Sequence, residues 1–156
     1  MFFIGEQNRQ VRLDFGSGCK RSGFRLTVDT SGVFQMINLP SPINATSLKI
    51  TITDTWNIGN NGWKEISFYG CYGATPVLHP CRYDETCTLN NELKLTGQTC
   101  SASSSIYGFF STCQFAYDGS DIPWASGQGV GEWIFINFNS WVTLRRIVFI
   151  QTGTLT

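Results

Sequence analysis

Hydrophobic and polar residues alternate along several short stretches of this chain of 156 residues. The alternating series are Val11, Leu13 and Phe15; Phe24, Leu26 and Val28; Leu48, Ile50 and Ile52; Ile66 and Phe68; and Ile134, Ile136 and Phe138. A period of two places the apolar side chains on one face, as in a half-buried antiparallel strand. Residues 144–151, LRRIVFIQ, predict a further strand. No segment shows a sustained helical period, so the pattern predicts an all-β sandwich or jelly roll.

Residues 72–99 interrupt this pattern with Pro, Gly and polar residues, and only LKLT within them suggests a brief strand. Connectors of this length are usually functional or joining segments. Cys81 and Cys87 can close a small loop that stiffens the connector. The connector separates a first block of strands, residues 1–71, from a second block, residues 100–156. Because the length suits one domain, we expect residues 1–156 to form a single domain.

The charge of the chain excludes one class of partner. Lys and Arg total 11, Asp and Glu total 11, and the formal net charge is zero. The chain therefore lacks the basic field that proteins use to bind nucleic acid, and we expect no nucleic-acid partner. No apolar run approaches the roughly 20 residues that span a bilayer.

The chain contains six cysteines, an even number that fits three disulfides. They are Cys19, Cys71, Cys81, Cys87, Cys100 and Cys113. Disulfides favour an oxidising compartment, so we expect an extracellular or cell-surface protein. Zinc is the alternative, but the chain has no CxxC pair and only one histidine, His79. The sequon Asn44-Ala45-Thr46 predicts glycosylation of Asn44 and agrees with secretion.

The two blocks carry motifs of a known family in an unusual order. The second block contains, in sequence, SASSS, AYDG, WAS, WIFINF and LRRI. This combination resembles the opening half of discoidin, or coagulation-factor type C, domains of the galactose-binding-like superfamily. The first block, with ATSLKI and EISFYGC, resembles the closing half of the same domain. The resemblance covers most of the chain and implies a jelly-roll sandwich that is circularly permuted. The alternative is the end of one tandem repeat followed by the start of the next.

The resemblance also implies a pattern of disulfides. In this family the two ends of the domain lie close together and are often joined by a disulfide. The matching pair here is Cys71–Cys100, with the connector looping out between them. If Cys81 pairs with Cys87 inside the connector, Cys19 and Cys113 remain as the third pair.

The segment AYDGSDIPW suggests a calcium site. Calcium prefers six to eight oxygen ligands from carboxylates and loop carbonyls. Many relatives in the family bind a structural calcium at the A-x-D-G turn, helped by a glutamate from the closing strand. The residues that match are Asp118, Asp121, Glu65 and the carbonyl of Ala116. The alternative is that Asp118 and Gly119 form a tight turn and that Asp121 is simply solvated.

Aromatic side chains in expected loops are the candidates for ligand binding, because sugar rings stack on aromatic planes while polar side chains bind their hydroxyls. The segment SIYGFFST matches a region that forms a hydrophobic spike on the ligand-binding face of several relatives. The alternative is that its two phenylalanines fold inward. Trp124 and Trp133 match positions that pack in the core. The candidate ligand-binding residues are Tyr107, Phe109, Phe110, Trp56, Trp63, Asn60 and Asn61.

We expect no catalytic activity, because the sequence has no nucleophile elbow, phosphate-binding glycine loop or zinc-hydrolase motif. The preferred function is an extracellular carbohydrate-binding adhesion module for a cell-surface or matrix glycan or glycoprotein. One alternative is a structural subunit of an extracellular coat or fibre, which self-associates by head-to-tail exchange of half-domains. Another is a lipid-binding module that inserts an aromatic spike, although zero net charge provides no general attraction to anionic lipid.

Overall fold

The computed structural model describes residues 8–26, 34–55, 61–76, 86–105 and 112–151. These residues form eight strands and a short 3-10 helix, and every strand pairing is antiparallel. The elements are β1 (Asn8–Phe15), β2 (Lys20–Arg25), β3 (Phe34–Thr55), β4 (Gly62–Tyr72), β5 (Leu93–Lys94), β6 (Thr99–Ala102), η2 (Cys113–Ala116), β7 (Trp124–Ala125) and β8 (Trp133–Gln151). The prediction of an all-β fold is confirmed.

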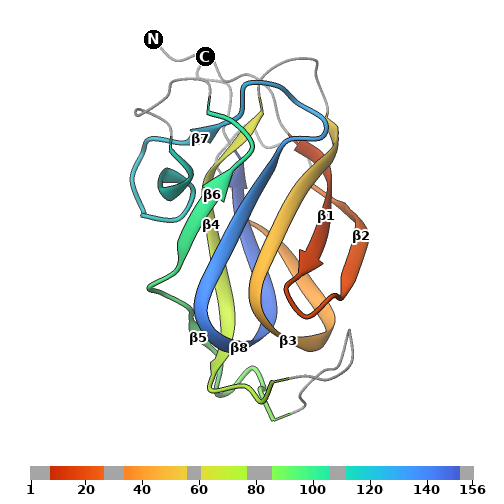
Figure 1. Ribbon diagram of the computed structural model, residues 1–156, viewed down its shortest axis with the longest axis vertical. Helices are drawn as coiled ribbons and strands as arrows, with labels where there is room; N and C mark the ends of the chain where they lie inside the picture. The colour runs from red at the N-terminus through yellow and green to blue at the C-terminus, as the bar shows by residue number, and fades with distance from the viewer. Residues whose placement is uncertain (1–7, 27–33, 56–60, 77–85, 106–111, 152–156) are drawn as a thin grey trace.

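Strands β3 and β8 are unusually long, with 22 and 19 residues, and they pair along most of their length. Both strands bend at the same end of the molecule, which is the lower end in Figure 1. Their ladder is interrupted between Asn38 and Ile43 and again between Ala45 and Ser47. In β8 the bend includes Asn139, whose φ of 60° lies in the left-handed region. We call this end of the molecule the corner.

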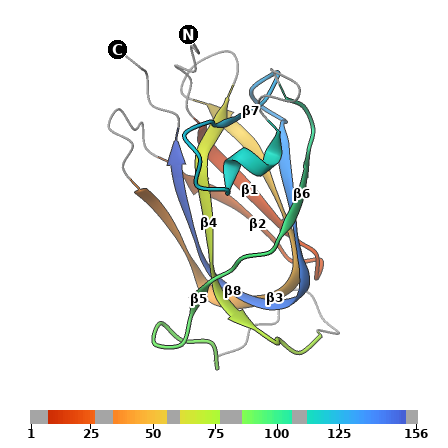
Figure 2. The same cartoon turned by 90° about the vertical axis from the view of Figure 1, so that its left-hand side faces the viewer.

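The corner folds the sheet back on itself into a sandwich-like arrangement of two layers (Figures 1 and 2). In the first layer, residues 48–55 of β3 pair with β1, and residues 134–137 of β8 pair with β6. In the second layer, residues 142–151 of β8 pair with β4. Strand β8 belongs to the second sequence block, yet it lies between β3 and β4 of the first block. Because the two blocks already pair within one chain, exchange of half-domains between chains requires β8 to leave both neighbours.

Alternating residues of the predicted strands form the core between the layers. Val11, Leu13, Ile50, Ile134 and Ile136 are fully buried. Burying side chains of this kind contributes roughly 1.5–3 kcal/mol each, which makes the core the main source of stability.

Tryptophans pack at the end of the sandwich opposite the corner. Trp124 is fully buried and stacks on Trp63, with ring centroids 5.3 Å apart. The ring of Phe149 also packs against Trp63, with ring centroids 5.7 Å apart. The predicted core position of Trp124 is confirmed. Trp133 is only half-buried, and the ammonium group of Lys49 lies 4.6 Å from its ring centroid.

The disulfides differ from the expected pattern. Cys71 is joined to Cys87, and Cys100 is joined to Cys113. Cys19 is also disulfide-bonded, and Cys81 lies outside the described residues. The expected pairs Cys71–Cys100, Cys81–Cys87 and Cys19–Cys113 are therefore wrong.

The reason is the position of the two strands that carry Cys71 and Cys100. Cys71 in β4 lies opposite Thr143, in the second layer, whereas Cys100 in β6 lies opposite Ile136, in the first layer. The disulfide that often joins the two ends of discoidin domains is therefore not formed between the matching cysteines of this chain. The disulfides nevertheless suit a non-reducing environment. In the described residues, no helix has the length and apolar character needed to cross a membrane.

Asn44 does not have the exposed position that glycosylation requires. Its side chain is 3% exposed within β3. The Nδ2 atom donates a hydrogen bond to the carbonyl of Thr75 at 3.2 Å, and Oδ1 accepts one from Thr143 Oγ1 at 2.7 Å. These contacts join β3 to β8. Because a glycan would have to be attached to this buried Nδ2 atom, the glycosylation prediction is wrong.

Gly70 allows β4 and β8 to approach closely near the corner. A Cβ atom at this position would lie 1.9 Å from the carbonyl oxygen of Thr143. We therefore expect Gly70→Ala to lower the free energy of unfolding by about 1–3 kcal/mol, the usual cost of overpacking. Chemical denaturation measures this loss. Gly127→Ala is the control, because its Cβ would meet only the Ser104 side chain, at 3.3 Å. Equal stability of the two variants would contradict the prediction.

Candidate ligand-binding site

Five of the seven predicted ligand-binding residues belong to segments that the structure does not describe. Tyr107, Phe109, Phe110, Trp56 and Asn60 lie outside the described residues. Their role stays a prediction.

Trp63 and Asn61 were expected in an exposed loop, and this placement is wrong. Both residues are fully buried. Strand β7 pairs with the beginning of β4, so that Trp63 lies opposite Trp124. The carbonyl of Asn61 accepts hydrogen bonds from the backbone N–H and the hydroxyl of Ser126, both at 2.7 Å. The ring of Trp63 is therefore part of the core and is not available to stack on a sugar.

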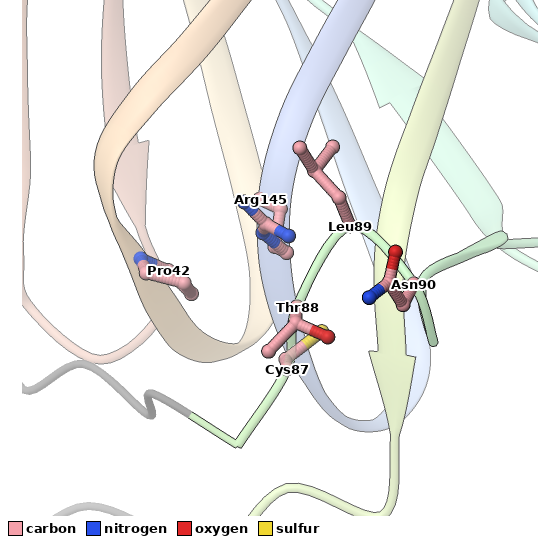
Figure 3. Close-up of a pocket in the computed structure, with 6 residues that line it drawn as sticks. All are labelled: Pro42, Cys87, Thr88, Leu89, Asn90 and Arg145. Atoms are coloured by element: carbon pink, nitrogen blue, oxygen red, sulfur yellow. The ribbon is translucent and has the colours of Figure 1, made fainter.

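A pocket lies at the corner, where Pro42 and Arg145 are among its lining residues. The corner and β7 are at opposite ends of the sandwich (Figure 1). Its volume is about 470 Å³, within the range of roughly 300–1,000 Å³ that is typical of small-molecule sites. Figure 3 shows Pro42 on the bend of β3 at one side and residues 87–90 at the other, with Arg145 of β8 between them. The lining residues are Pro42, Cys87, Thr88, Leu89, Asn90 and Arg145.

A β-bulge positions Arg145 at this pocket. On β4, Tyr69 lies opposite Arg146 and the next residue, Gly70, lies opposite Leu144. Arg145 is consequently an extra residue in β8 with no partner in the β4 ladder. A bulge of this kind redirects a side chain and is common next to functional sites. Since Leu144 and Ile147 are buried, both arginines between them lie on the outer side of the layer.

The wall formed by residues 87–90 is held in place by a disulfide and by hydrogen bonds of Asn91. Cys87 is joined to Cys71 at the end of β4. The Oδ1 atom of Asn91 accepts a hydrogen bond from the Thr88 N–H at 2.6 Å, and its Nδ2 atom donates to the carbonyl of Thr86 at 2.9 Å. This ordered turn presents Leu89, which is 67% exposed, and the exposed Asn90 at the mouth of the pocket.

The neighbouring arginine has a different role. Arg146 donates from Nε to Glu92 Oε1 at 2.7 Å, and its guanidinium carbon lies 4.2 Å from the ring centroid of Tyr69. The Glu92 side chain is only 5% exposed, so this ion pair is well shielded from water. Arg146 therefore joins β8 to β4 and to the chain before β5, which supports the wall of the pocket.

Carboxylates expected to form a calcium site lie at a second place, beside β4. Glu65 Oε2 accepts a hydrogen bond from the N–H of Gly119 at 3.1 Å. Asp118 Oδ1 accepts one from the N–H of Ser120 at 2.8 Å, which closes the turn. The structure thus brings Glu65 to the Asp118–Gly119 turn. Asp121 differs, because its carboxylate is 97% exposed and pairs with Lys64 at 3.1 Å. Ala116, whose carbonyl was expected to contribute, is buried at the end of η2.

The surroundings of Glu65 offset the cost of burying its negative charge only in part. Its Oε1 atom is buried and accepts no hydrogen bond, and the nearest cation, Lys94 Nζ, is 3.8 Å away, too far for one. Burial raises the pKa of Glu65, and the negative charge of Asp118 adds to this effect. The hydrogen bond from Gly119, the charge of Lys94 and a weaker interaction with the Ser67 side chain act in the opposite direction and offset this rise only in part.

This carboxylate group fits a calcium ion in part. Glu65 and Asp118 converge and one buried oxygen lacks a partner, but Asp121 is directed to Lys64. Among the described residues, no group of three or more His, Cys, Asp or Glu side chains is arranged to hold a metal ion.

Comparison with known proteins gives no family for this chain. No protein-family model, curated protein or solved structure matches it.

Proposed function

We propose that this chain is an extracellular carbohydrate-binding module, without catalytic activity, that recognises a glycan or glycoprotein on a cell surface or in the matrix. The observation that carries the proposal is the open pocket at the corner. It combines a cation and polar side chains with the exposed apolar side chain of Leu89. Sugars require this mixture, because they present both hydroxyl groups and apolar C–H faces.

The ordered walls of the pocket support binding. The disulfide at Cys87 and the hydrogen bonds of Asn91 fix the turn before any ligand arrives. A preformed site loses less conformational entropy on binding, which favours affinity for a small ligand. A single shallow site of this kind binds weakly, so several copies on one surface would supply avidity.

We also propose that the fold is a jelly roll of the galactose-binding-like type with its sequence halves in reversed order. Two observations support this proposal. The first is the pairing of β8 with both β3 and β4, which unites the two blocks. The second is the contact of Glu65 with Gly119, 54 residues away in the sequence, which the resemblance implies for the calcium site. In this proposal calcium is held by Glu65 and Asp118 and braces the turn against β4.

Binding to an array of neutral and acidic glycans tests the proposed function. We expect a defined set of glycans to bind and a Leu89→Ser variant to bind them at least about tenfold more weakly, since a buried apolar contact of this size is worth roughly 1.5–3 kcal/mol. Thermal unfolding of the same samples verifies that both proteins are folded. A folded wild-type protein that binds no glycan on the array would contradict the proposed function.

A further inference from the structure

The guanidinium group of Arg145 lacks the partners that a buried cation normally has. Its Nε and Nη1 atoms are buried and donate no hydrogen bond to any described residue. Leaving buried donors of a charged group without acceptors is costly, and more so than for neutral groups. The adjacent Arg146, by contrast, has both an ion pair with Glu92 and a ring contact with Tyr69. Arg145 is therefore a cation whose acceptor is missing from the described part of the protein.

We propose that the corner pocket binds an anionic sugar residue, whose carboxylate or sulfate group accepts hydrogen bonds from Arg145. This inference rests on the proposed function and names its ligand class. Charge-assisted hydrogen bonds from arginine to such oxyanions are about twice as strong as neutral ones. Because the net charge of the chain is zero, no general electrostatic field attracts anions, and the selectivity must come from this contact.

The other lining residues suit the ring of the sugar. Pro42 and Leu89 supply apolar surfaces on opposite sides of Arg145 (Figure 3). Asn90 is exposed at the mouth and forms no hydrogen bond with a described residue, so its amide is available to the hydroxyl groups of a sugar. Thr88 is tied to Asn91 and serves mainly as a fixed edge of the pocket.

The carboxylates that the structure describes at the corner and beside β4 have partners other than Arg145. Glu92 accepts a hydrogen bond from Arg146 at Oε1, and its buried Oε2 atom accepts none from a described residue. The Glu65 and Asp118 pair lies near Gly119 and Lys94. No ion pair among the described residues includes Arg145. An external anion therefore meets a cation that no described residue neutralises.

The test compares each neutral sugar with an anionic counterpart that differs from it only at carbon 6. Calorimetric titrations use galactose and galacturonate, glucose and glucuronate, and 6-sulfated galactose, each with the wild-type protein. We expect the carboxylate member of at least one pair, or the sulfated sugar, to bind about tenfold or more tightly than its neutral counterpart, as a charge-assisted hydrogen bond predicts. Comparing carboxylate with sulfate identifies the source of the anion. Inorganic sulfate alone is the probe for an anion site that does not recognise a sugar.

Two variants locate the effect. Arg145→Gln is expected to remove the preference for the anionic sugars, because it weakens their binding about tenfold more than that of the neutral sugars. Because Arg145 forms no ion pair with a described residue, we expect this variant to fold, and thermal unfolding verifies it. Arg25→Gln is the control, since it removes the same charge from an exposed position in β2. It should leave the preference intact.

The outcomes separate this inference from the proposed function. Neutral and anionic sugars that bind the wild-type protein equally would overturn the inference but leave glycan binding standing. An anionic preference that persists in Arg145→Gln would also overturn it. Inorganic sulfate that binds as tightly as the sulfated sugar would show that the ring is not recognised. If the protein binds none of these sugars and no glycan on the array, both proposals are overturned. The comparison of neutral with anionic sugars uses the wild-type protein and so does not depend on the folding of any variant.

Discussion

Removing the disulfide between Cys71 and Cys87 is expected to lower the free energy of unfolding by about 3 kcal/mol and to weaken glycan binding by about tenfold or more. The two cysteines are 16 residues apart. In the chain-entropy view, a crosslink that closes a loop of this length stabilises the folded state by roughly 3 kcal/mol. For a protein of about this size, the loss corresponds to a decrease in melting temperature of roughly 6–12 °C. Binding weakens because the wall at residues 87–90 loses its covalent attachment to β4 and must be ordered when the ligand binds.

The second disulfide is a matched control for this variant. Cys100 and Cys113 are 13 residues apart, so their removal is expected to cost nearly the same stability. They do not line the corner pocket. The double variants Cys71→Ala/Cys87→Ala and Cys100→Ala/Cys113→Ala should therefore have similar melting temperatures, while only the first loses glycan affinity. Equal loss of affinity in both variants, measured well below their melting temperatures, would show that the pocket wall is not the cause.

The strand pattern of the sequence predicts most of the core, because alternate residues of a strand point to the same face and that face is buried here. Leu48, Ile50 and Ile52 alternate, and all three are buried in β3. The same holds for Ile134 and Ile136 in β8. Where one face of a strand packs on the other layer, the apolar residues must repeat every second position.

The corner is the part of the fold that the pattern does not reveal. The sequence predicts two separate strands at the end of the chain, but β8 is continuous from Trp133 to Gln151. The bend at Asn139 and the bulge at Arg145 shift the alternation, so that the two halves of β8 look independent. The first half of β3 was also missed. Pro40 and Pro42 are typical of turns, but here they lie where the ladder with β8 is interrupted.

The pocket could not be predicted because its walls come from distant parts of the chain. Pro42, Leu89 and Arg145 meet only after β3 and β8 bend and after Cys87 pairs with Cys71. The alternation at Leu144 and Ile147 by itself predicts only that at least one of the intervening arginines points to solvent. The structure adds that Arg145 lies at a pocket and that Arg146 pairs with Glu92. The wrong disulfide prediction concealed the connection between Cys71 and Cys87, which orders this wall.

The grouping of Glu65 with the Asp118–Gly119 turn came from motif resemblance, and the structure places these residues in contact. Asp121 shows the limit of that reasoning. A motif gives the order of residues along a turn, but the direction of an exposed side chain depends on its neighbours. Here Lys64, next to Glu65 in β4, attracts the carboxylate of Asp121.

Replacing Glu65 by Gln is expected to have opposite effects in the absence and presence of calcium. Without calcium, the variant should be more stable than the wild-type protein at pH 7. The pKa of Glu65 is raised from its ordinary value of 4.5, chiefly by burial. A raised pKa in the folded state means that the folded protein binds this proton more tightly than the unfolded chain. The contribution of Glu65 to stability is therefore fully present below the unfolded pKa and is lost as the pH rises through the folded pKa.

This pH dependence provides an internal control for the variant. The site disfavours the charge of the wild-type carboxylate, whereas glutamine carries no charge and keeps an oxygen that can accept the hydrogen bond from Gly119. The advantage of Glu65→Gln in chelator should decrease toward pH 4, where the wild-type side chain is protonated in the folded state. A variant that is less stable than wild type at pH 7 in chelator would show that Lys94 and Gly119 outweigh the cost of burial.

With calcium, the order of stability should invert. If Glu65 and Asp118 hold the ion, calcium at about one hundred times its dissociation constant stabilises the wild-type protein by about 2.7 kcal/mol, which raises its melting temperature by roughly 5–11 °C. Glu65→Gln and Asp118→Asn should lose this increase, because hard cations depend on charged oxygen ligands. Asp121→Asn is the matched control, since its exposed carboxylate pairs with Lys64 and should contribute little. Differential scanning fluorimetry of the four proteins, in chelator and across a calcium titration, measures the inversion.

A wild-type melting temperature that does not respond to calcium would remove the ion from the proposal. The raised pKa of Glu65 would then be a consequence of packing alone.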